Sequence, residues 1–355
     1  MRIIHTSDIH LDSPLTTRLS ADKVRERKRE LVDTFRRSVD KAIELGAIGY
    51  IISGDLFDSE KVTRSSLENL MVLIASVPQL TFFYLFGNHE RRVIVDSGVD
   101  IPKNLKIFDD GWTYYKLDDV VIAGRCETER GMFDTLQLDR EKRNIIVLHG
   151  ELCDRSDSDG AIGVKEIAEL PIDYIALGHY HTYSESRISG RCTAVYSGTP
   201  EGRGFDEVGR KGVVVIDADR YGVRHEFLPT AKRTLHEVCA DISGARHGLD
   251  IENAVENATR GIPNTDIVRV LLTGERTLGE SPETSTVEAR FKDRFYYFEI
   301  KDETRVRICA DDFRGDRSLK GEFIRSVIAD DRLSDEEKDK VIATGLRALL
   351  GESID

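Results

Sequence analysis

The chain begins MRIIHTSDIHLD (residues 1–12), an apolar run of strand type that leads directly into the polar motif Asp8-Ile9-His10. The same succession of an apolar run and a polar motif returns in YIISGDLFD, residues 50–58. Through roughly the first 180 residues, apolar β-rich runs alternate with helical patterns, beginning with a strand at 2–6 and a helix at 20–45. This alternation is typical of an α/β architecture.

Five short polar motifs each follow a predicted strand. They are Asp8-Ile9-His10-Leu11-Asp12, Gly54-Asp55-Leu56-Phe57-Asp58, Gly87-Asn88-His89-Glu90, His149-Gly150-Glu151 and Gly178-His179-Tyr180-His181. In α/β sheets, ligands bind beyond the carboxyl ends of the strands. We therefore expect the five motifs to converge on one site.

The residue types in these motifs are those of a metal site. Carboxylates, imidazoles and one amide, without a thiolate, suit Mn²⁺, Fe²⁺ or Zn²⁺. The candidate ligands are Asp8, His10, Asp55, Asn88, His149, His179 and His181. They are too many for one four- to six-coordinate ion and indicate two ions that share a carboxylate. A two-metal site activates a water as nucleophile and clamps phosphoryl oxygens during displacement.

The ordered set DxH, GDxxD, GNHE, HG and GHxH resembles the calcineurin-like metallophosphoesterases, and DIHLD with GDLFD is most similar to the SbcD-type DNA repair exonucleases. The resemblance implies a four-layer α/β/β/α sandwich. It also implies one ion on Asp8, His10, Asp55 and His181, and a second ion on Asp55, Asn88, His149 and His179. His89 would be the catalytic residue that stabilises the phosphoryl transition state or protonates the leaving oxygen. Two positions are informative within the family, because Glu90 replaces a usual Asp and Asp58 is typical of bacterial SbcD-like chains.

We expect three parts along the chain. Residues 1–230 form the metallophosphoesterase domain, in which 191–228 are predicted to be antiparallel sheet. Residues 231–312 form a small α+β cap domain, and 313–355 form a C-terminal helical segment in which Ser334 and Glu337 fit a capping box. The resemblance implies that this segment docks onto an SbcC-like ABC-type ATPase, although packing on its own domain is an equal alternative, and a homodimer is also possible.

The formal net charge of −13 argues against a protein whose whole surface binds nucleic acid. Two divalent ions would reverse the sign locally, where a phosphate must lie. The basic segment 18–41 could contact DNA phosphates through Arg25, Arg29 and Arg36, or it could be a solvated helix face with internal ion pairs. The loop 198–204 is either a tight turn that closes the sheet or a loop on the substrate side.

The sequence thus predicts a Mn²⁺-dependent phosphodiesterase that acts on DNA as an exonuclease with endonuclease activity in repair. The alternatives are a small-molecule phosphodiesterase or phosphomonoesterase on the same site, and a non-catalytic scaffold. The five cysteines are scattered without a CxxC pair, so we expect them to be reduced. The chain opens without a secretory signal and has no apolar run of membrane length, so the expected location is cytoplasmic.

Overall fold

The computed structural model describes residues 1–15, 19–58, 62–87, 93–154, 160–245, 247–277, 282, 284–307 and 315–349. The chain divides into two compact units, Met1–Leu235 and His236–Asp355. This division lies close to residue 230, where the sequence analysis places the end of the phosphoesterase domain. The first unit holds all five polar motifs.

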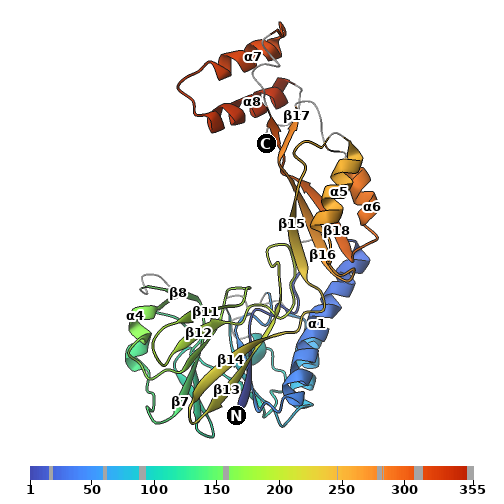
Figure 1. Ribbon diagram of the computed structural model, residues 1–355. Helices are drawn as coiled ribbons and strands as arrows, with labels where there is room; N and C mark the ends of the chain where they lie inside the picture. The colour runs from blue at the N-terminus through green and yellow to red at the C-terminus, as the bar shows by residue number, and fades with distance from the viewer. Residues whose placement is uncertain are drawn as a thin grey trace. The chain divides into compact units, whose positions relative to one another are not determined.

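The first unit is built on two six-stranded mixed sheets (Figure 1). One has the strand order β14-β13-β1-β2-β3-β4, and its bounds are β1 Arg2–Thr6, β2 Gly49–Ser53, β3 Thr81–Leu85, β4 Leu105–Ile107, β13 Gly212–Asp219 and β14 Gly222–Pro229. Strands β1 to β4 are parallel, while β13 and β14 run antiparallel to their neighbours. The carboxyl ends of β1, β2 and β3 therefore meet at one edge.

The other sheet has the order β11-β12-β10-β7-β6-β5. Its bounds are β5 Thr113–Leu117, β6 Val120–Gly124, β7 Arg143–His149, β10 Tyr174–Gly178, β11 Ser184–Arg187 and β12 Thr193–Tyr196. Strands β6, β7, β10 and β12 are parallel. The prediction of antiparallel sheet over 191–228 holds for β12 on only one side, because β12 pairs antiparallel with β11 and parallel with β10. Strands β13 and β14 are antiparallel, as predicted, and lie in the other sheet.

Side chains that alternate along the strands build the layers. On β1, Ile3 packs in the core between the two sheets, and Ile4 packs in a second core together with helices α1 (Ala21–Glu44) and α2 (Arg64–Ala75). This period of two is the pattern of a strand buried on both faces. The outer face of the second sheet is covered by a third core. Its short elements are 3-10 helix η1 Met132–Thr135 and α4 Val164–Ile167. The predicted α/β/β/α sandwich is confirmed.

Helix α1 begins where the sequence predicts, with the Ser20 side chain accepting a hydrogen bond from the Lys23 amide as N-cap. Its basic residues differ in their surroundings. Arg27 is buried and pairs with Glu30 and Glu201. Arg233 and Lys232 also bind Glu30, which ties the helix to the chain segment after β14. Arg27 is therefore an internal structural residue.

The three arginines that the sequence proposes for DNA contact lie on the exposed side of α1. Arg25 forms an ion pair with Asp22 three residues before it, as the alternative of a solvated helix face predicts. Arg29 and Arg36 are exposed as well. Exposure of all three residues agrees with both interpretations of this helix face, so the DNA contact stays a prediction.

The second unit contains a three-stranded sheet of order β15-β16-β18 with its own core. Its elements are β15 Leu235–Asp241, α5 Gly248–Ala258, β16 Ile267–Thr273, α6 Thr284–Phe291 and β18 Tyr297–Asp302. The predicted turn-rich gap after Thr273 contains a short strand, β17 Glu275–Thr277, which pairs with β19 Arg305–Arg307. Three-residue strands carry too little pattern to be recognised in sequence.

A helical hairpin follows in the same unit, formed by α7 Leu319–Ile328 and α8 Asp335–Leu349 (Figure 1). The capping box is confirmed: the Glu337 carboxylate accepts from the Ser334 amide at 2.8 Å, and the Ser334 hydroxyl accepts from the Glu337 amide at 3.4 Å. Apolar side chains pack between the helices, including Ile324 and Leu346. Leu319 is 73% exposed.

Candidate metal centre

The loops that follow the strands of the first sheet run side by side. The amide of Asp8 donates to the carbonyl of Gly54 at 3.0 Å, and the amide of His10 donates to the carbonyl of Asp55 at 3.1 Å. From the second sheet, the amide of His179 donates to both carboxylate oxygens of Asp8, at 3.1 and 3.2 Å. Loops from both sheets therefore meet around the Asp8 carboxylate.

Five of the seven predicted ligands form two overlapping groups that share Asp8. One group joins Asp8, His10 and His181, and the other joins Asp8, Asp55 and His149. Within each group the potential ligand atoms lie within 4.8 Å of one another. The Oδ2 atom of Asp55 lies 3.8 Å from Nε2 of His10 and 3.5 Å from Nε2 of His149. Asp55 therefore stands between the histidines of the two groups.

The remaining predicted residues are placed differently. The ring of His179 lies 5.7 Å from that of His149, centroid to centroid, but His179 belongs to neither group. Asn88, His89 and Glu90 lie outside the described residues. His5, which the sequence leaves out of the site, is buried between the sheets and hydrogen-bonds to Tyr174 and Ser53.

The tautomer of His149 follows from its partner. Its Nδ1 lies 2.9 Å from the main-chain carbonyl oxygen of Ser53, which can only accept a hydrogen bond, so Nδ1 carries the proton. The lone pair is then on Nε2, which is buried and makes no hydrogen bond within the described part of the chain. A buried acceptor without a donor is costly, and a cation would satisfy it.

The backbone around the ligands adopts conformations that are rare for residues with side chains. Asp8, His10 and Asp55 have positive φ angles of 49°, 48° and 51°, and His179 has 109°. Each such residue costs on the order of 1–3 kcal/mol and persists only where the surroundings enforce it. Strain concentrated in this way is characteristic of a functional site.

Glycines make room for the ligands. A Cβ on Gly87 would lie 1.8 Å from Oδ1 of Asp55, and one on Gly54 would lie 2.2 Å from Nδ1 of His149. A Cβ on Gly178 would lie 2.0 Å from the carbonyl oxygen of Ser53, which holds His149. These glycines are required because no side chain fits against the ligands.

The electrostatics of the centre also fit a cation. Burial raises the pKa of Asp8 above its ordinary value, although His149, Ser7 and His181 act in the opposite direction. A divalent ion beside this carboxylate would favour its charged form. Two carboxylates and three imidazoles without a thiolate are a donor set that suits Mn²⁺, Fe²⁺ or Zn²⁺.

Sequence reasoning missed two residues of the site, Arg203 and Glu207. Nδ1 of His181 lies 2.7 Å from Oε1 of Glu207. Arg203 binds Glu207 at 2.6 Å and Asp58 at 3.2 Å. Arg203 thus brings the loop 198–204 to the side of the metal centre, while Thr199 of the same loop accepts a hydrogen bond from the amide of Gly212 at the start of β13. No motif or spacing marks Arg203 or Glu207 in the sequence.

Asp58, whose residue type is typical of one branch of the family, contacts a candidate ligand. Its Oδ1 lies 2.9 Å from Nδ1 of His10. Asp12 in turn accepts a hydrogen bond from the Asp58 amide at 2.7 Å. Asp12 thus stabilises a turn beside the site.

The sequence of residues 1–183 matches the family model of the calcineurin-like phosphoesterases. The chain belongs to this family. Calcineurin-like phosphoesterases use divalent metals, and the ligand groups around Asp8 and Asp55 are where this protein could hold them.

Among curated relatives, the uncharacterized metallophosphoesterase YhaO of Bacillus subtilis is 24% identical over 279 residues, 72% of this chain and 67% of that protein. The DNA double-strand break repair protein Mre11 of Sulfurisphaera tokodaii is 28% identical over 242 residues, 61% of this chain and 59% of that protein. Mre11 of Methanopyrus kandleri is 27% identical over 327 residues, which are 80% of this chain and 66% of that protein. The chain thus spans roughly three fifths to two thirds of these relatives' lengths.

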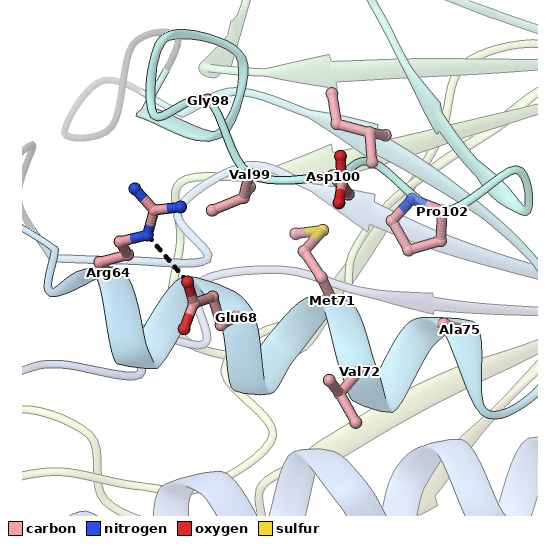
Figure 2. Close-up of a pocket in the computed structure, with 10 residues that line it drawn as sticks. Arg64, Glu68, Met71, Val72, Ala75, Gly98, Val99, Asp100 and Pro102 are labelled. Carbon is pink, nitrogen blue, oxygen red and sulfur yellow. Dashed lines mark hydrogen bonds and ion pairs between the residues drawn. The ribbon is translucent and has the colours of Figure 1, made fainter.

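A separate cavity of about 570 Å³ lies between α2 and the segment 98–102. Figure 2 shows Arg64 and Glu68 on α2 reaching toward each other across one turn, where Nε and Oε1 are 2.8 Å apart. None of the candidate metal ligands lines this cavity.

Among the helices of the described residues, none is long and apolar enough to cross a membrane.

Proposed function

We propose that the protein is a dinuclear-metal phosphodiesterase that cleaves DNA, as an exonuclease with endonuclease activity, in DNA repair. The observation that carries the proposal is the position of Asp55, whose Oδ2 faces the Nε2 atoms of both His10 and His149. A carboxylate that faces one imidazole from each ligand group is suited to lie between two adjacent ions. Relatives named for double-strand break repair favour DNA as the substrate.

The ligand assignment is part of the proposal. One ion would be held by Asp8, His10, Asp55 and His181, and the other by Asp55, Asn88, His149 and His179. Divalent ions bound there, most suitably Mn²⁺, would activate water and neutralise charge on the phosphoryl oxygens. His89 would assist at a non-bridging or leaving oxygen of the phosphate.

Hydrogen bonds within the chain orient the candidate ligands of the centre. The amide of His179 fixes the Asp8 carboxylate from the second sheet, and the carbonyl of Ser53 turns Nε2 of His149 toward Asp55. These groups are already buried and oriented, so little reorganisation is needed when an ion or a phosphate binds.

DNA affinity must arise against a net charge of −13. The exposed arginines of α1, Arg25, Arg29 and Arg36, are proposed to contact DNA phosphates. With few such contacts the affinity is expected to be weak and to fall with salt.

The partner predictions concern the helical hairpin of α7 and α8. Its inner residues, such as Ile342 and Leu346, pack within the hairpin, while Leu319 and Leu349 stay exposed. Docking of these helices onto an ABC-type ATPase stays a prediction, as does the homodimer.

The substrate class is tested with metal-stripped full-length protein to which Mn²⁺ is added back. We expect cleavage of linear duplex DNA, single-stranded DNA and a small phosphodiester, and little hydrolysis of a phosphomonoester. His149→Ala serves as the matched inactive control. Strong monoesterase activity without DNA cleavage would contradict the proposal and favour a small-molecule phosphatase.

A further inference from the structure

The guanidinium of Arg203 links two carboxylates, each of which contacts a candidate metal ligand. Arg203 binds Oε1 of Glu207 through both Nε (3.0 Å) and a terminal nitrogen (2.6 Å). Its other terminal nitrogen lies 3.2 Å from Oδ1 of Asp58 and 3.4 Å from Oγ of Ser13. The Arg203 side chain is only 13% exposed and Glu207 is 1% exposed. The cluster is thus buried at Glu207 and partly exposed at Asp58, which is 28% exposed.

Both carboxylates of the cluster contact the Nδ1 atom of a candidate ligand. Asp58 meets Nδ1 of His10 at 2.9 Å, and Glu207 meets Nδ1 of His181 at 2.7 Å. The other ring nitrogen of each histidine faces the centre, because Nε2 of His10 lies 3.8 Å from Oδ2 of Asp55 and Nε2 of His181 lies 3.9 Å from Oδ1 of Asp8. Arg203 also lies 3.2 Å from Nδ1 of His181. A carboxylate partner also makes the imidazole a more basic and better oriented ligand.

His149 is held differently. Its Nδ1 donates to a neutral main-chain carbonyl, that of Ser53. The Nδ1 atoms of His10 and His181 are contacted by two carboxylates, which share one guanidinium, so the three groups carry a net charge of −1. In the described residues, no charged group contacts Nδ1 of His149. The two metal positions therefore differ in the groups that support their histidines.

We propose that Arg203 is a positioning residue that, by joining Asp58 to Glu207, makes the metal position of His10 and His181 bind its ion more tightly than the position of His149. This inference rests on the proposed dinuclear centre. The planar fork of arginine spans two carboxylates in a way that the single ammonium of lysine does not. Removal of Arg203 leaves the two carboxylates unneutralised and free to turn away from the histidines.

The test measures Mn²⁺ binding to metal-stripped full-length protein by calorimetry. Wild type is expected to show two classes of site with different affinity. His149→Ala should remove the weaker class, and Arg203→Gln added to His149→Ala should weaken the remaining class by about 10–100-fold. Asp58→Asn, at a more exposed position, should weaken the same class by a similar factor, and Arg203→Lys should restore only part of the affinity.

Arg191→Gln is the matched control, because Arg191 also forms a two-point ion pair, with Asp173, but lies away from the metal ligands. It should leave both Mn²⁺ affinities within about threefold of wild type while circular dichroism confirms folding. Two equal sites in wild type, or unchanged affinity in folded Arg203→Gln and Asp58→Asn, would overturn the positioning role alone. Absence of Mn²⁺ binding to wild type would instead overturn the dinuclear centre.

Discussion

Asp55→Asn is expected to abolish phosphodiesterase activity and to release both ions while the fold is kept. The carboxylate oxygen of Asp55 faces Nε2 of His10 and of His149, so its loss disturbs both metal positions at once. Metal ions stabilise the transition state by several kcal/mol, which corresponds to a rate loss on the order of 10³-fold. Activity on a phosphodiester and Mn²⁺ content of the purified variant are the measurements.

The control for this substitution is Asp118→Asn. Asp118 also has a positive φ, of 51°, but it lies in the exposed turn between β5 and β6. Asn tolerates this backbone conformation, so the local strain is matched in the two variants. A folded Asp55→Asn variant with full activity and two bound ions would show that Asp55 does not bridge them.

The second large effect is on stability. Glu30→Gln is expected to lower the free energy of unfolding at pH 7 by about 3–5 kcal/mol, because it leaves buried cations without their carboxylate. Burial alone would raise the pKa of Glu30, but hydrogen bonds from Arg233 and Lys232 and the charge of Arg27 lower it to about 2, below its ordinary value of 4.5.

The sign of the pH dependence follows from this lowered pKa. The contribution of Glu30 is present in full above pH 4.5 and is lost as the pH falls from 4.5 toward 2. In urea denaturation, the difference in free energy of unfolding between wild type and Glu30→Gln should therefore shrink as the pH falls from 4.5 toward 2. The control is Glu68→Gln, which breaks the exposed ion pair with Arg64. It should lower the free energy of unfolding by less than about 1 kcal/mol both at pH 7 and below pH 4.5. A difference between wild type and Glu30→Gln that is absent at pH 7, or that does not narrow below pH 4.5, would contradict the role of Glu30.

Much of the fold is predictable because local signals agree with it. The helix expected at 20–45 is Ala21–Glu44 with Ser20 as its cap. The strand before Asp8 is Arg2–Thr6, and that before Asp55 is Gly49–Ser53. Both are buried on two faces, so their apolar runs are continuous and easily recognised.

The direction of pairing was not predictable from the same signals. Strand β12 pairs antiparallel with β11, its neighbour in the sequence, but its parallel pairing with β10 on the other side leaves no mark in so short an apolar run. The burial of Arg27 was missed for a similar reason. Its partner Glu201 lies 174 positions later in the sequence, where no periodicity connects the two.

The residues of the candidate site also include some that the sequence predicts and some that it does not. Ligands such as Asp8 and Asp55 follow strands directly and carry recognisable motifs. Arg203 and Glu207 lie in a loop after β12 and reach His181 and Asp58 only through tertiary structure. Supporting residues of this kind need only the right position in space, so the sequence around them need not follow a short pattern.

The dinuclear centre is tested most directly by anomalous diffraction at the manganese absorption edge, from crystals of the full chain grown with Mn²⁺. Two adjacent anomalous peaks are expected, both in contact with the Asp55 carboxylate, one beside His10 and His181 and the other beside His149. A single peak, or two peaks of which neither contacts Asp55, would contradict the assignment.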